Sequence, residues 1–326
     1  MADVTDCVFR QIIAKYGKPD VSWTEFVSAD GLAHPKVREK LLIDLKFSKK
    51  EHPIVAQIFG SNPDNIQKAS ALCQKLGFDG VDINMGCPVK KVLNQNSCSA
   101  LIRTPELAKE IILAAKRGAG DIPVSVKTRI GFNKMEIDTW IPSLLEAEPA
   151  ILTVHLRTVK EMSKVGAHWE TMKEIVNIRD RMKKETLIIG NGDVLDLEDG
   201  KRKCAEYGCD GVMLGRAIFG NPWLFSKRSP LKFYTSEGST QYSGKGAGME
   251  NFKGRSFIEK KLKVLVEHTK LFEKLLGKHK NFAIMKKHYK AYANGFEGAK
   301  ELRVKLMETK NAKEVGEIIN DFLKQI

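Results

Sequence analysis

The sequence predicts an α/β fold, in which a parallel β-sheet is covered by helices and followed by a separate α-helical bundle. Two observations carry this prediction. In the first two thirds of the chain, short apolar stretches rich in β-branched residues alternate with longer stretches of helical periodicity. This alternation is typical of repeated β-α units, whose parallel strands are buried on both faces. In the last third, only the helical periodicity remains.

Seven apolar stretches have the length and composition of buried strands. They cover residues 23–27, 54–59, 80–85, 123–129, 151–156, 187–190 and 211–214. The stretches around them have the periodicity of amphipathic helices. These helices are predicted over residues 5–16, 35–45, 63–76, 105–116, 135–146, 169–182 and 197–207.

The composition changes after the last apolar stretch. Residues 235–255 are rich in Gly, Ser and Thr and have no periodicity, so a linker or exposed loop is predicted over 231–256. Further helices are predicted over residues 257–276, 283–292, 298–307 and 312–323. The chain is therefore expected to hold a sheet domain over 1–230 and a helical domain over 257–326.

The chain is basic, with 54 Lys and Arg against 40 Asp and Glu and a net charge of +14. Residues 231–326 hold 20 of the basic residues and 11 of the acidic ones, so most of the excess lies in the helical part. Lysines are dense between residues 260 and 290, with Phe272, Phe282 and Tyr289 among them. Lysines on helix faces are often only solvated, but this density favours contact with nucleic-acid phosphates.

Other features narrow the class of protein. No apolar run is long enough to span a bilayer, and the N-terminus has no signal-peptide pattern, so a cytoplasmic protein without membrane contact is expected. The six cysteines have no regular spacing, which argues against a disulfide framework and for a reducing compartment. Cys204 and Cys209 lack the further ligands that would complete a zinc site, so no metal is expected.

The most informative stretch is the strand predicted over 80–85 and the turn after it, which read GVDINMGCPVKK. The strand breaks at a glycine, and Pro88 prevents it from continuing, so Cys87 is expected at the strand tip. Asn84 lies on the strand, and Lys90 lies just beyond the turn. Strand tips are where α/β enzymes place their chemistry. The alternative interpretation is a buried structural cysteine before a turn.

Three other predicted strands carry an isolated polar residue, namely Gln57, Lys127 and His155. A polar group in a buried strand must be hydrogen-bonded, or it destabilises the fold by about 1–3 kcal/mol. Each residue alone could be a satisfied polar group of the core. Together, on three strands of one sheet, they suit a bound heteroaromatic ring.

Two glycine-containing strand ends lie near the close of the sheet domain. The first is Asn191-Gly192-Asp193, and the second is Gly215-Arg216. In (β/α)8 barrels, the loops after the last two strands commonly form a phosphate site, because backbone N–H groups converge there. A glycine allows close approach of the backbone, and Arg216 adds a charge-assisted donor.

These motifs resemble those of the dihydrouridine synthases, flavoenzymes that reduce uridine in tRNA. The resemblance is carried by residues 80–100, by the two glycine-containing strand ends and by the run Gly220-Asn221-Pro222-Trp223-Leu224-Phe225. It spans nearly the whole chain and looks closest to the bacterial B-type subfamily. It implies a TIM (β/α)8 barrel followed by a helical domain that binds tRNA. Because the family's first barrel strand precedes the position of Met1, the barrel is expected to be truncated at its N-terminus.

The resemblance also implies cofactors and roles. FMN is the expected cofactor, NADPH or NADH the reductant and tRNA the partner, with a monomeric protein. Cys87 is the expected proton donor to the base, while Cys98 is interpreted as a small filler near the site rather than a second redox thiol. The implied FMN contacts are Met1, Ala2, Gln57, Lys127, His155, Asn191, Gly192, Asp193, Gly215 and Arg216. The implied substrate contacts are Asn84, Lys90, Arg157, Lys286, Lys287 and Arg303.

Two other functions stay open at the level of the sequence. The same barrel could be a flavin oxidoreductase that acts on a free small molecule, although the basic helical part argues against it. The chain could also be a non-catalytic RNA-binding protein built on a decayed barrel. Bound flavin would exclude the second alternative, and tRNA affinity at moderate salt would argue against the first.

Overall fold

The computed structural model describes residues 1–226 and 255–326. The chain divides into two compact units, each drawn from two segments. The first unit comprises Met1–Cys7 and Asp20–Ala217, and the second comprises Val8–Pro19 and Ile218–Ile326. The predicted linker lies outside the described residues except for its last two positions, which begin a helix. The predicted domain boundaries stay predictions.

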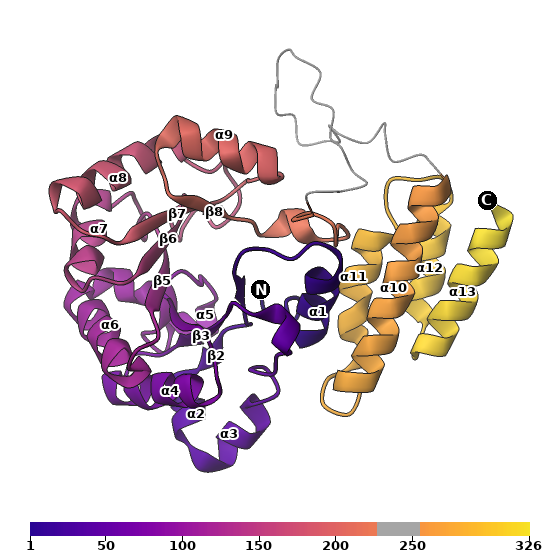
Figure 1. The fold of residues 1–326 in the computed structure, drawn as a ribbon, viewed down its shortest axis with the longest axis horizontal. Coiled ribbons are helices and arrows are strands. Elements are labelled where there is room, and N and C mark those ends of the chain that lie inside the picture. Colours follow the sequence, from indigo (N-terminus) through magenta and orange to yellow (C-terminus); the bar gives the residue numbers. More distant parts are fainter. Residues whose placement is uncertain (227–254) are drawn as a thin grey trace. The chain divides into compact units, whose positions relative to one another are not determined.

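The first unit is built on a parallel sheet with the strand order β1-β3-β4-β5-β6-β7-β8, in which β2 also pairs with β3. The sheet curls, and its helices lie on the outside (Figure 1). Among the described residues, β8 pairs with β7 alone, so the sheet curls without closing. The strands are β1 (Ser22–Trp23), β2 (Val27–Ser28), β3 (Ile54–Phe59), β4 (Gly80–Asn84), β5 (Val124–Arg129), β6 (Ile151–His155), β7 (Leu187–Asn191) and β8 (Gly211–Met213).

The helices of the first unit follow the strands in the β-α order that the sequence predicts. They are α2 (Ala29–Ala33), α3 (Pro35–Leu41), α4 (Pro63–Lys75), α5 (Lys90–Leu93), α6 (Pro105–Ala119), α7 (Ile137–Glu146), α8 (Met172–Arg181) and α9 (Leu197–Tyr207). The α/β class, the parallel sheet and the helices after it are therefore confirmed. The strand that the resemblance places before Met1 stays a prediction.

The strand predicted over residues 23–27 is wrong in one respect, because it is divided into β1 and β2. The division has a local cause at Thr24. Its hydroxyl accepts a hydrogen bond of 3.0 Å from the backbone N–H of Gln57, where a continuous ladder would use a backbone carbonyl. The same hydroxyl donates to the carbonyl of Glu25 at 2.8 Å. The side chain therefore replaces a ladder bond and interrupts the strand.

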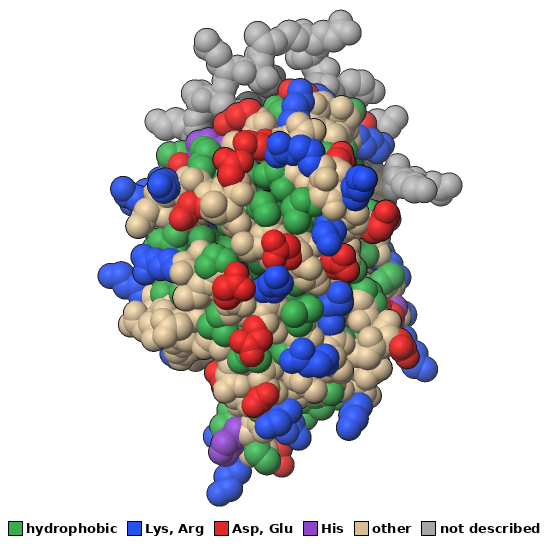
Figure 2. All heavy atoms as spheres, turned by 90° about the vertical axis from the view of Figure 1, so that its left-hand side faces the viewer, with side chains coloured by type: hydrophobic (Ala, Val, Ile, Leu, Met, Phe, Trp, Pro, Cys, Tyr) green, Lys and Arg blue, Asp and Glu red, His purple; other side chains and the backbone are tan. Residues whose placement is uncertain are grey.

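The helices pack closely on the sheet and on each other. All five residues of β4 are buried, as expected for a central parallel strand covered on both faces. Helices α4 and α6 touch at Gly118, where an added Cβ would lie 2.1 Å from the carbonyl oxygen of Gln67. The outer face of this unit carries acidic and basic side chains interspersed (Figure 2), so this face has no extended area of one charge sign.

The second unit is helical. It contains α10 (Arg255–Leu276), α11 (Met285–Tyr292), α12 (Ala299–Glu308) and α13 (Ala312–Gln325), which lie side by side (Figure 1). Most of the first helix of the chain, α1 (Cys7–Tyr16), belongs to this unit as well. The sequence patterns do not anticipate this pairing of the two ends of the chain. No described helix is long and apolar enough to cross a membrane.

Contacts from α1 to α10 and α11 explain the pairing. The ring of Phe9 lies 5.7 Å from that of His268 and 5.1 Å from that of His288, measured between centroids. At the end of α1, Lys15 forms an ion pair of 2.7 Å with Glu267, and the Tyr16 hydroxyl donates to the same carboxylate. The apolar side of α1 is thus buried among the C-terminal helices.

Candidate active site

The register of the sheet brings the predicted site residues to one edge. Asn84 on β4 is the partner of Lys127 on β5. His155 on β6 is the partner of Arg129 on one side and of Asn191 on the other. Because the carboxyl ends of parallel strands lie at the same edge of a sheet, the side chains that the sequence singles out on separate strands are neighbours in the structure.

The Cys87 turn is held by Asn84. The side-chain oxygen of Asn84 accepts hydrogen bonds of 3.0 Å from the backbone N–H groups of Gly86 and Cys87. These two bonds end the strand and fix the direction in which the cysteine leaves it. The role of Asn84 as a contact of the substrate base stays a prediction. In the structure, Asn84 also anchors the turn that carries Cys87.

A buried hydrogen-bond chain runs from Asn84 into the sheet. Its side-chain nitrogen donates to the Oε1 atom of Gln57 at 3.0 Å. The Nε2 atom of Gln57 donates to Asp82 at 2.7 Å, and the Ser125 hydroxyl donates to the other oxygen of the same carboxylate at 2.6 Å. Burial raises the pKa of Asp82, and the bonds from Ser125 and Gln57 oppose that rise.

Cys87 is half-buried and has a second cysteine beside it. The Cys98 thiol contacts the sulfur of Cys87, and the Ser99 hydroxyl donates to the carbonyl of Cys87 at 2.7 Å. The contact with Cys98, a bond from the Val89 backbone and the charges of Arg129 and Lys127 outweigh burial, and they lower the pKa of Cys87 to about 6. The same contact and burial raise the pKa of Cys98.

Arg129 joins the cysteine turn to the loop after β6. Its guanidinium donates to the carbonyl of Gly86 at 2.8 Å, and to the carbonyls of Thr158 and Met162 at 3.0 Å each. The residue is buried, and burial together with the Arg157 charge lowers its pKa to about 10. Arg129 remains a cation at neutral pH, and its side chain holds the Cys87 turn and the loop after β6 together.

Lys127 lies between the cysteine and the last strands. Its Nζ atom donates to the side-chain oxygen of Asn191 at 3.0 Å. These residues belong to β5 and β7, with β6 between them, so their side chains lie on the same face of the sheet. Burial and the Arg129 charge lower the pKa of Lys127 to about 8. Burial and four nearby cations lower the pKa of His155 to about 2, so this imidazole is neutral.

Asp193 is the acidic centre of the loop after β7. One of its oxygens accepts from the Arg157 guanidinium and, at 2.9 Å, from the backbone N–H of Ala167. The other accepts from Arg216 at 2.8 Å. The structure therefore places Arg157 beside Asp193 and the Nε2 atom of His155, at 3.1 Å. Its predicted contact with the substrate stays a prediction.

The two predicted glycines differ in their surroundings. Gly192 has a φ of +124°, and a Cβ there would lie 2.8 Å from the Cβ of Ala167, so the backbone conformation and the packing both require glycine. A Cβ at Gly215 would meet no atom within 4 Å. The space beside Gly215 is open, and the Arg216 side chain next to it is 66% exposed.

The remaining predicted residues do not join this cluster through any bond named above. Met1 lies in an N-terminal turn in which its amine donates to the Thr5 hydroxyl at 2.7 Å, with Ala2 exposed after it. Lys90 is exposed at the start of α5. In the second unit, Lys286 is half-buried and Lys287 exposed, and Arg303 donates to the carbonyl of Ala293 at 3.0 Å.

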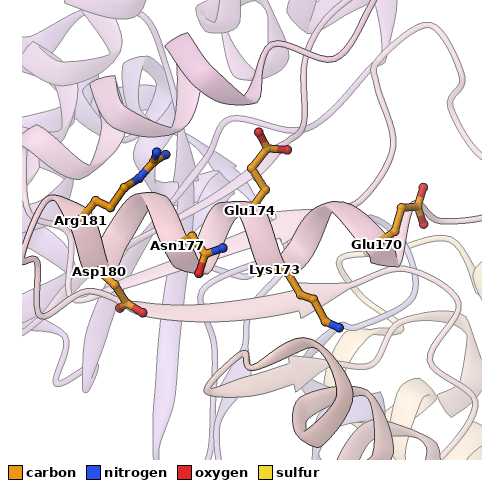
Figure 3. Close-up of a pocket in the computed structure, with 6 residues that line it drawn as sticks. All are labelled: Glu170, Lys173, Glu174, Asn177, Asp180 and Arg181. Atoms are coloured by element: carbon orange, nitrogen blue, oxygen red, sulfur yellow. The ribbon is translucent and has the colours of Figure 1, made fainter.

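One shallow hollow lies away from these residues, on η3 (Trp169–Thr171) and α8. Its lining is Glu170, Lys173, Glu174, Asn177, Asp180 and Arg181. In Figure 3 these side chains spread to both sides of the helix and do not converge on one position. None of the predicted site residues lines this hollow, so it is not a candidate for the chemistry.

Sequence reasoning missed two residues of the site, Asp82 and Arg129. Asp82 and Arg129 stand two positions from Asn84 and Lys127, and alternation along a strand puts each on the same face as its neighbour. A charged residue at that spacing inside an apolar strand was the available signal. The filler role of Cys98 stays a prediction, and its buried side chain interacts with the Cys87 thiol. No signal in the sequence reveals that contact.

Comparisons with known proteins show the family of this chain. The family model described as dihydrouridine synthase matches residues 1–326. The probable tRNA-dihydrouridine synthase of Staphylococcus aureus (strain Mu50 / ATCC 700699) is 39% identical over all of this chain and 92% of its own length. The probable tRNA-dihydrouridine synthase 2 of Bacillus subtilis (strain 168) is 39% identical over 99% of this chain and 92% of its own.

A solved structure also aligns with this chain, at a lower sequence identity. A variant of NCR from Zymomonas mobilis aligns with 71% of this chain and 83% of its own, at 18% identity and a TM-score of 0.49, which is too low to support a functional argument. The family model and the two relatives cover the strand-end cluster and the helical unit alike. The chain belongs to the dihydrouridine synthase family.

Proposed function

We propose that this protein is a tRNA-dihydrouridine synthase, a flavin-dependent oxidoreductase that reduces the C5–C6 double bond of uridine in tRNA with FMN and NADPH or NADH. The observation that carries the proposal is the placement of Cys87. It leaves the carboxyl end of β4 half-buried, is held by two backbone hydrogen bonds, and lies among the cations Lys127 and Arg129. The names of the two relatives support the tRNA substrate.

The donor set at the strand ends fits FMN. Lys127, Arg157 and Arg216 supply positive charge, while Asp193 is the carboxylate that bonds two of them. The open space beside Gly215, next to Arg216, suits a phosphate. Lys127 and the neutral His155 suit the flavin ring of FMN. The side-chain amide of Gln57 is already hydrogen-bonded to Asp82 and Asn84. When bound, FMN supplies the hydride that the reduction requires.

Cys87 would supply the proton that the reduction places on C5 of the base. A thiol of ordinary pKa, about 8.5, is mostly protonated at neutral pH, as a proton donor must be. In the protein by itself, contact with Cys98 and the nearby cations lower the pKa of Cys87 to about 6. Anionic tRNA phosphates brought near the thiol disfavour its ionised form. Substrate binding would therefore help to protonate the donor that the substrate needs.

The second unit would hold the tRNA backbone. Lys287 and Lys290 on α11 are exposed and could reach phosphates. Lys261 is buried instead, and burial lowers its pKa to about 8. Phe272 and Tyr289 are core residues, so they are not free to stack on bases. The contact proposed here is electrostatic, made by a monomer in the cytoplasm.

Mapping dihydrouridine in tRNA from cells with and without this gene tests the function. Loss of the modified base at one or more positions in the deletion strain is the expected result. In vitro, Cys87→Ala should form dihydrouridine roughly 10²–10⁴-fold more slowly, since a positioned general acid contributes about that factor. Retention of FMN and of tRNA affinity should accompany this loss. Unchanged tRNA in the deletion strain, with turnover of a free enone, would favour a small-molecule oxidoreductase.

A further inference from the structure

The strand-end site contains one buried carboxylate that no step above uses. Asp82 is fully buried in the centre of β4. Both of its oxygens accept hydrogen bonds, one from Gln57 at 2.7 Å and one from Ser125 at 2.6 Å. A buried carboxylate is costly unless it is paired or bonded, so its position calls for a reason beyond packing.

The carboxylate fixes the orientation of the amide beside it. An amide side chain has one donor end and one acceptor end, and both oxygens of Asp82 accept hydrogen bonds in this structure. Gln57 must therefore present its NH2 group to Asp82, as it does. This leaves the Gln57 oxygen facing Asn84, which donates to it at 3.0 Å.

The same logic continues to the cysteine turn. With its NH2 group engaged by Gln57, Asn84 must present its oxygen to the turn. Two backbone N–H groups, those of Gly86 and Cys87, bond to that oxygen at 3.0 Å each. The chain has an acceptor at one end and donors at the other, so every link has one favourable direction.

We propose that Asp82 is a positioning residue for Cys87, acting through Gln57 and Asn84. The inference rests on the proposed function for its catalytic consequence, but the position of the thiol can be measured without it. Removing the carboxylate leaves the Gln57 amide free to turn, and the turn that carries Cys87 loses the fixed orientation of its anchor. The thiol then no longer keeps its contact with Cys98.

The experiment measures the pH dependence of Cys87 alkylation by iodoacetamide, quantified on its peptide by mass spectrometry. In Asp82→Ala the midpoint should rise by about one pH unit or more, toward that of an ordinary thiol. The dihydrouridine-forming kcat should fall about tenfold or more, because a misplaced general acid loses part of its contribution. The alkylation midpoint needs no substrate, so it reports the position of the thiol even where a reoriented Asn84, a predicted contact of the base, also raises the KM for tRNA.

Two variants separate positioning from a merely structural role. Ser125→Ala removes the other hydrogen bond to the same carboxylate but leaves the link to Gln57, so its alkylation midpoint should match the wild type. Asp82→Asn should rescue, because its oxygen can still accept from Gln57 while its NH2 group donates to the Ser125 hydroxyl. If Asp82→Ala does not fold, Gln57→Leu interrupts the next link and should give the same shift.

A wild-type midpoint in folded Asp82→Ala or Gln57→Leu would overturn the proposal. So would an equal shift in Ser125→Ala, which would show that disturbing the buried carboxylate is enough. If the midpoints behave as expected but the wild-type protein forms no dihydrouridine, the proposed function fails while the positioning of Cys87 by Asp82 stands.

Discussion

At the scale of single residues, the thiol pair decides how Cys87 behaves. Cys98 is fully buried and has a φ of +56°, in a region that favours glycine. A residue other than glycine is strained in that backbone conformation. The conformation persists only where the surrounding structure fixes it. Its thiol contact is the largest of the influences that lower the pKa of Cys87. Cys98, which the sequence predicts to be a small filler, thus lowers the pKa of Cys87.

This contact predicts a pH profile. The thiolate is the species that reacts with iodoacetamide, so alkylation of Cys87 should reach half its maximal rate near pH 6, where its pKa lies. Below that pH the thiol is protonated and the rate falls. Cys98→Ala removes the largest lowering influence and should move the midpoint up toward an ordinary thiol pKa of about 8.5. Cys73→Ala, a buried cysteine remote from this contact on α4, is the matched control. A midpoint that does not respond to Cys98→Ala would contradict the role of the contact.

At the scale of elements, the sequence predicts the repeated strands and helices, but it does not predict the division of a strand that depends on a single hydrogen bond. The strands predicted over residues 54–59 and 80–85 agree closely with the observed β3 and β4. Short apolar runs rich in β-branched residues and bounded by Gly or Pro favour a strand over other secondary structure. The division at Thr24 could not be predicted, since it depends on a hydroxyl meeting the N–H of Gln57 from a distant part of the chain.

The same distinction applies to the candidate site. Cys87, Lys127 and His155 stand out in the sequence because each interrupts an apolar pattern at a strand end. The interactions of Asp82 and Cys98 require knowledge of which strands are neighbours and which turn folds back. Register and turn geometry supply that knowledge, and periodicity alone does not.

The contact between α4 and α6 gives a prediction at this scale. In Gly118→Ala the added Cβ would lie 2.1 Å from the carbonyl oxygen of Gln67, so the two helices must separate. Overpacking of this kind costs about 1–3 kcal/mol, which thermal unfolding should show as a lower Tm. Gly316→Ala on α13 is the control, because its Cβ would meet only Val266 at 3.9 Å. That variant should be neutral or slightly stabilised, and a Gly118→Ala protein with wild-type Tm would refute the close contact.

At the scale of the whole molecule, the excess of positive charge predicts how tRNA binds. Lys287→Ala combined with Lys290→Ala should weaken tRNA binding and lower the salt slope by about one to two, because each phosphate contact releases roughly one counterion. The control is Lys313→Ala with Lys324→Ala, which removes the same charge from α13 of the same unit. Filter binding over a salt series measures both. Equal losses in the two double variants would mean that net charge, rather than α11, attracts the RNA.

The placement of α1 in the second unit has a consequence for synthesis on the ribosome. Val8, Phe9 and Ile12 are almost fully buried there, yet α10 begins only at Arg255. At a translation rate of about 5–20 residues per second, the apolar side of α1 emerges roughly 10–50 s before its packing partners exist. During that interval the sheet unit can fold while α1 stays uncovered. The nascent chain therefore carries α1 as an exposed apolar helix, which chaperones can bind until α10 and α11 have been synthesised.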